Sequence, residues 1–138
     1  IKHQEEIGKY LSSPPESSIA DVVHMAGERP SAPTDIIAQT GARAIDVLGA
    51  ASWMTDMANY VNQVTGHPNV VIQMGYGVPT STVKPGSMAI VTYQGSTAEH
   101  DEATAKLRTD KGYLKRMASA IDYFDMGSFF NILMRKLI

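Results

Sequence analysis

The feature that most constrains this chain is a stretch of 29 residues, 67–95, in which Lys84 is the one Asp, Glu, Lys or Arg. Charged side chains are rarely buried, so water-facing surface normally carries many of them. We therefore expect this stretch to lie mostly inside the protein or against another chain. With 138 residues, of which 43% are hydrophobic and 19% are charged, the chain is large enough for one domain with its own core.

The overall composition excludes several classes of protein. The chain has no cysteine, which excludes disulfides, zinc–thiolate sites, iron–sulfur clusters and thiol catalysis. A net charge of −2 gives no general attraction to nucleic acid or anionic lipid. No apolar run reaches the roughly 18–20 residues of a transmembrane helix, and no signal peptide opens the chain. We expect one soluble domain over residues 1–138. Because it begins with Ile1, we interpret it as a fragment or processed piece of a longer chain.

Two short runs within the charge-poor stretch have the composition of strands. Residues 70–74 and 87–93 are rich in β-branched and apolar side chains. Between them lie several glycines and prolines, which are typical of a turn-rich loop. The sequence therefore predicts a β-hairpin or small sheet within residues 69–94.

The first third of the chain has helical punctuation. Ser13 and Glu16 fit a capping box, and the apolar residues from Ile19 to Ala26 then follow at helical spacing. Two prolines in residues 30–33 predict a linker. Thr34 or Asp35 could cap a further helix that begins with Ile36. These patterns predict short helices before residue 42.

The clearest periodicity lies between residues 42 and 65. Apolar residues recur there with spacings of 3, 4, 3, 4 and 3, the alternation of a heptad seam. Gly66 and Pro68 follow and are typical of a helix end. The pattern predicts one long helix whose apolar seam contains Val47, Ala50, Met54, Met57, Val61 and Val64.

The last third also has helical patterns. Ser96 and Glu99 fit another capping box, which predicts a helix to about Asp110. A second helix is predicted from the spacing of Leu114, Met117, Ile121 and Phe124. Residues 127–138 contain seven apolar side chains in twelve, with a stripe at i, i+3, i+4 and i+7, which predicts a C-terminal helix.

Together these segments predict the α+β class: a helix-rich single domain with one small β-hairpin or sheet, residues 69–94, flanked by helices. The alternative is an all-α bundle in which residues 69–94 form an extended arm.

The densest group of potential catalytic or metal-binding side chains is the run from Glu99 to Glu102, which includes His100. Carboxylate and imidazole groups serve as metal ligands and as acid–base catalysts. On a helix these four side chains point in different directions, and no two of the four histidines have ligand spacing. We therefore predict no catalytic residue, no cofactor-binding residue and no metal ligand, and expect that the protein is not an enzyme.

Basic residues cluster between residues 106 and 116. Arg108, Lys111 and Lys115 could share one helical face and contact phosphate or an acidic partner. A solvated face is the competing interpretation, because no aromatic residues are interleaved with these cations.

A four-residue match occurs in the predicted linker, where the chain reads Pro30-Ser31-Ala32-Pro33. This tetrapeptide is similar to the P-[S/T]-A-P late-domain motif of viral structural proteins, which recruits host budding machinery. The match covers four residues of 138. The resemblance implies that residues 30–33 are exposed and act as a peptide ligand for another protein.

From these features we predict a structural or assembly module that self-associates into a homo-oligomer or packs on a larger protein. A viral or phage component of capsid, coat or matrix type is one such module. In that case we expect the protein to be located in the virion. The alternatives are a small enzyme with a His/carboxylate acid–base pair and a weak nucleic-acid-binding module using the basic segment 106–116. The predicted interface residues are apolar: Met54, Met57, Val61, Phe129, Phe130, Leu133 and Leu137.

Overall fold

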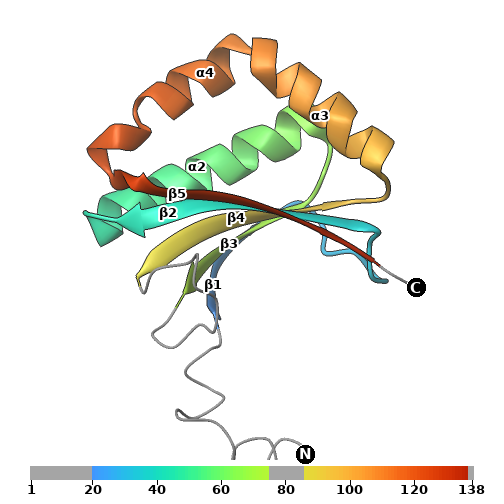
Figure 1. Cartoon of the computed structure of the whole chain (residues 1–138), viewed down its shortest axis with the longest axis horizontal. Coiled ribbons are helices and arrows are strands. Elements are labelled where there is room, and N and C mark those ends of the chain that lie inside the picture. The colour runs from blue at the N-terminus through green and yellow to red at the C-terminus, as the bar shows by residue number, and fades with distance from the viewer. Residues whose placement is uncertain (1–19, 75–85, 137–138) are drawn as a thin grey trace, which may run out of the picture.

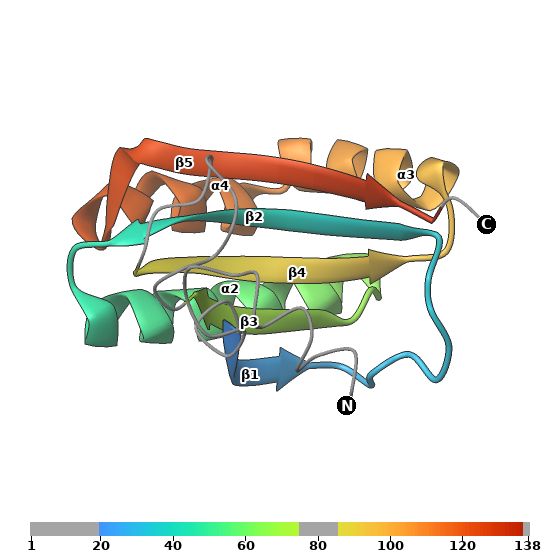
Figure 2. The ribbon, with the colours of Figure 1, turned by 60° about the horizontal axis from the view of Figure 1, so that its bottom comes forward.

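Five antiparallel strands form one sheet in the order β1-β3-β4-β2-β5 in the computed structural model, which describes residues 20–74 and 86–136. Figure 2 shows β5 along one edge of this sheet and β1 along the other. The strands are β1 (Ala20–Ala26), β2 (Ile36–Ala44), β3 (Asn69–Met74), β4 (Ser87–Gln94) and β5 (Phe124–Arg135). The helices are α2 (Val47–Thr65), α3 (Thr97–Thr109) and α4 (Lys111–Ala118), followed by the 3₁₀ turn η2 (Ala120–Asp122).

All three α-helices lie on the same face of the sheet (Figure 1). Strand alternation directs Val71 and Met88 toward the helices, whereas Val70, Ala89 and Phe130 point to the other face. Apolar side chains therefore occupy both faces of the sheet. Within the described residues, no helix is long and apolar enough to cross a membrane.

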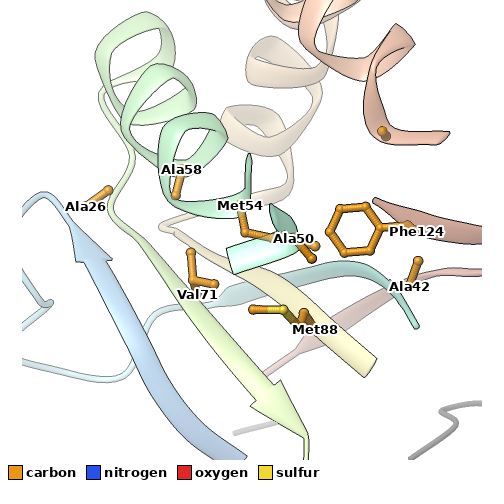
Figure 3. Close-up of a cluster of buried hydrophobic side chains, with 9 residues drawn as sticks. Ala26, Ala42, Ala50, Met54, Ala58, Val71, Met88 and Phe124 are labelled. Carbon is orange, nitrogen blue, oxygen red and sulfur yellow. The ribbon is translucent and has the colours of Figure 1, made fainter. Parts of the chain in front are cut away.

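The main core lies between α2 and the sheet (Figure 3). Ala50 and Ala58 are fully buried, and their small side chains let the helix approach the strands closely. Met54 fills the space between them, and Trp53 packs edge-on against Phe124 with ring centroids 5.3 Å apart. The cluster thus joins α2 to the sheet and to the beginning of β5.

The long helix and the one after β4 begin and end near the predicted residues. The Asp46 carboxylate accepts from the Gly49 amide at the start of α2, and Gly66 closes the helix in the left-handed conformation. At α3 the Ser96 hydroxyl accepts from the Glu99 amide, while the Glu99 carboxylate accepts from the Gly95 amide. Ser96 therefore caps the helix as predicted.

The predicted helices before residue 42 are wrong where the structure describes them. Residues 20–26 form β1 and residues 36–44 form β2, while Ser13, Glu16 and Ile19 lie outside the described residues. Within the predicted stripe, Val22 lies opposite Ile72, whereas Ala26 lies opposite Asn69 and belongs to the main core, so a bulge between Val22 and His24 places these two residues on opposite faces of β1. Apolar residues on both faces of a strand can thus have the spacing of a helical stripe.

The predicted C-terminal helix is also wrong, because residues 124–135 form β5, paired with β2. The preceding helix ends at Ala118, so Phe124 begins a strand instead of completing a helical stripe. In a strand with apolar side chains on both faces, apolar residues occupy odd and even positions. Some of them are therefore three and four residues apart, as they would be on one side of a helix. Phe129, Phe130 and Ile132 are moreover good strand formers.

The chain is α+β, but the predicted helix-rich arrangement with one small hairpin is wrong. β3 and β4 do pair antiparallel, yet they are two strands of a five-stranded sheet. The all-α alternative is wrong for the same reason. The error arose because three of the five strands were predicted as helices.

Met54→Ala should lower the free energy of unfolding by about 2–5 kcal/mol, because the side chain is 4% exposed and its loss leaves a cavity. Leu48→Ala is the matched control on the same helix, since Leu48 is 83% exposed. The control should change the free energy by less than about 0.5 kcal/mol in urea titrations. Equal effects of the two substitutions would contradict this packing.

Candidate interaction edge and adjoining cavity

The predicted interface residues divide into two groups. Met54, Met57 and Val61 are buried between α2 and the sheet of their own chain. Phe130 is buried on the other face of the sheet. By contrast Phe129 and Leu133 are 46% and 53% exposed on β5. Leu137 lies outside the described residues.

β5 is a long edge strand. It has 12 residues, and within the described part of the chain it pairs on one side with β2. Beyond its end, the Lys136 amide donates to the Asp35 carbonyl at 2.8 Å. Because the direction of amides alternates along an antiparallel strand, the N–H groups of Asn131, Leu133 and Arg135 point away from β2.

These outward groups form a sheet edge that no strand of the described residues covers. The opposite edge strand, β1, is shorter, with seven residues, and short edge strands limit pairing with another chain. Along β5 the exposed large apolar residues are Met126, Phe129, Leu133 and Met134.

The pairing of β2 with β5 has a bulge near the beginning of β5, and side-chain contacts stabilise it. The Ser128 hydroxyl donates to the Asp125 carbonyl at 2.6 Å and accepts from the Arg43 amide at 2.8 Å. The Arg43 guanidinium also pairs with the Asp125 carboxylate at 3.2 Å. This end of β5 thus carries an acidic residue, while its other end carries Arg135 and Lys136.

Beside β5, two connected hollows lie between the sheet and the helices. The inner one, of about 120 Å³, is lined mainly by apolar side chains that include Trp53, Met54, Met57 and Phe124. The outer one, of about 390 Å³, extends toward α3 and is lined by more polar groups. The two hollows share walls that include Val61, Leu107, Met117 and Phe129.

The outer hollow receives a polar stripe from α3. His100, Thr104 and Arg108 recur every four residues and therefore lie along one side of the helix. The His100 Nδ1 atom is 2.8 Å from the Oε1 atom of Gln94, a side chain that is 4% exposed. Across the hollow, the Thr40 hydroxyl donates to the Asn131 amide oxygen at 3.2 Å.

The three predicted anion-contact residues do not share one helix. Asp110 ends α3 and caps α4 by accepting from the Tyr113 amide, so Arg108 lies on α3 whereas Lys111 and Lys115 lie on α4. Of the three, Arg108 lines the outer hollow. Among the described residues, no carboxylate lies within ion-pair distance of its guanidinium.

A polar network holds α4 against α2. The Tyr60 hydroxyl donates to the Asp110 carboxylate at 2.5 Å, and Arg116 lies over the Tyr60 ring while it binds Asp56 at 2.7 Å. The bond from Tyr60, together with that from the Tyr113 amide, holds the pKa of Asp110 below its usual value. The same bond to Asp110 raises the pKa of Tyr60.

The acidic run at the start of α3 does not converge on one point. Glu99 binds the Gly95 amide, His100 contacts Gln94, and Glu102 pairs with Lys106 at 3.8 Å. In the described segments, no three His, Asp or Glu side chains are close enough together to hold a metal ion.

Sequence reasoning missed Gln94, Thr104 and the Tyr60–Asp110 contact. The four-residue spacing of the α3 stripe was visible in the sequence. Its position over the sheet was not, because that depends on how α3 packs. The tetrapeptide at residues 30–33 lies in the connection between β1 and β2, with Ser31, Ala32 and Pro33 exposed.

The chain matches no protein-family model, no curated protein and no solved structure.

The Asp110 contact predicts an acid-sensitive component of stability. Because the folded pKa of Asp110 is lowered, its stabilising effect is present above the unfolded value and is lost as pH falls through the folded pKa. The difference in unfolding free energy between the wild type and Asp110→Asn should therefore shrink as pH falls below the ordinary carboxyl value of 3.8. Asp101→Asn, at an exposed carboxylate of α3, is the control and should follow the wild type at every pH. A difference that is constant with pH would contradict the assignment.

Proposed function

We propose that the protein is a non-enzymatic assembly module that self-associates through β5. A second copy adds its own β5 antiparallel to this edge and extends the sheet across the interface. The observation that supports this proposal is the long, one-sided strand with outward amides and exposed apolar side chains. Edges of this kind pair readily with another strand.

The charges at the two ends of β5 bear on how a second copy would pair with it. The Asp125 carboxylate near the beginning of the strand is neutralised by Arg43, whereas Arg135 and Lys136 at its end have no such partner among the described residues. Antiparallel pairing of two copies keeps the two basic ends apart, whereas parallel pairing would bring these like charges together. The charges of the strand therefore favour the antiparallel direction.

The apolar side chains add the other part of the interaction. Phe129 and Leu133 share the helix-facing side of the strand, while Met134 points to the opposite side. Pairing of the two strands would remove apolar area from water on both faces, which contributes about 25 cal/mol per Å². The backbone hydrogen bonds supply direction, and the apolar contacts supply most of the affinity.

Light scattering tests this proposal directly. The wild-type protein should approach twice the 15.0 kDa of one chain as its concentration rises. Leu133→Lys should raise the dimer dissociation constant at least about tenfold, because it places two additional charges at the paired edge. Leu48→Lys is the control, since Leu48 is also an exposed leucine but lies on α2, away from the paired edge.

Hydrogen exchange separates edge pairing from other contacts. In the dimer, the outward amides of Asn131, Leu133 and Arg135 should be protected, and Leu133→Lys should remove that protection while the inward amide of Ile132 stays protected. A wild type that stays monomeric at millimolar concentration would overturn the proposal. A dimer whose outward β5 amides exchange freely would also overturn it.

A further inference from the structure

We propose that the two connected hollows form a binding site for an elongated apolar carboxylate. The carboxylate group would bind Arg108, and the apolar chain would extend toward Trp53. This inference is independent of the proposed self-association, because it rests on the space between the sheet and the helices.

The inner hollow supplies the apolar end of the site. Its walls include Met54 and Met57 from α2, Phe124 and Phe129 from β5, and Met117 from α4. Methionine and aromatic side chains adapt well to unbranched chains, because thioethers are flexible and aromatic faces are flat. A small space of about 120 Å³ with these walls favours a flexible chain over a bulky ring system.

The outer hollow supplies the polar end. Its volume of about 390 Å³ lies in the range of roughly 300–1,000 Å³ that small-molecule sites occupy. The contact between His100 and the buried Gln94 fixes one wall. The contact between Thr40 and Asn131 satisfies polar groups on another. The site thus combines a largely apolar interior with a few fixed polar groups at its mouth, as ligand sites do.

Arg108 determines the charge of the ligand. On the same helix Glu102 pairs with Lys106, and no carboxylate in residues 20–74 and 86–136 pairs with Arg108. A guanidinium can donate two parallel hydrogen bonds to a planar carboxylate. An anionic group at this position would therefore pair with a guanidinium that has no acidic partner among the described residues.

Sodium decanoate, kept below the concentration at which it forms micelles, is a suitable probe. Trp53 is the single tryptophan of the chain and lines the inner hollow, so its fluorescence reports on a bound chain. We expect a saturable change in Trp53 fluorescence with one decanoate per protein, measured in parallel by calorimetry. Acetate should give no change, because it has no chain to enter the inner hollow.

Matched substitutions test the role of Arg108. Arg108→Gln should raise the decanoate dissociation constant at least about tenfold, whereas Lys111→Gln, which removes the same charge outside the hollow, should change it less than about twofold. The affinity for decanol should be the same in the wild type and in Arg108→Gln, because decanol carries no charge. Leu133→Lys should bind decanoate like the wild type, which separates this site from self-association.

Three results would overturn the inference. The first is a wild type with no saturable binding of decanoate. The second is an equal loss of affinity in Arg108→Gln and Lys111→Gln, which would indicate general charge attraction. The third is saturable binding in calorimetry without any change in Trp53 fluorescence, which would place the chain elsewhere.

Discussion

The packing of α2 on the sheet is the interaction on which the rest of the structure depends. Ala50 and Ala58 allow the helix axis to approach the strands, and Met54 fills the interval between these alanines. The same helix presents Trp53 to Phe124 and Tyr60 to Asp110, so it positions both the start of β5 and the α3–α4 corner. Without this contact neither β5 nor the helices that line the cavity would be held in place.

The edge and the cavity follow from one geometric property of the fold. Three helices share one face of a five-stranded sheet, and α3 and α4 join at a corner held by Asp110. Since α2 packs against β1, β3 and β4, the corner spans the remaining distance toward β5 and leaves the hollows below it. β5 is the edge strand on this side of the sheet, and the described residues provide no further strand beyond it.

Phe129 connects the two proposals without making them depend on each other. Its side chain is part of both hollows and of the exposed surface of β5. Self-association would act on the backbone edge of β5, whereas the carboxylate ligand would contact Arg108 on α3.

The sequence by itself determined the elements whose signals are local. Gly66 ends α2, Ser96 caps α3, and the β-branched runs at residues 70–74 and 87–93 are strands. Tertiary structure alone decided β1, β2 and β5, because apolar side chains on both faces of β1 and β5 have the spacing of a helical stripe. A strand gains its hydrogen bonds from residues distant in the chain: β2 lies between β4 and β5, about 50 and 90 positions away. Periodicity along one segment cannot report such partners, so the edge and the cavity appeared only with the fold.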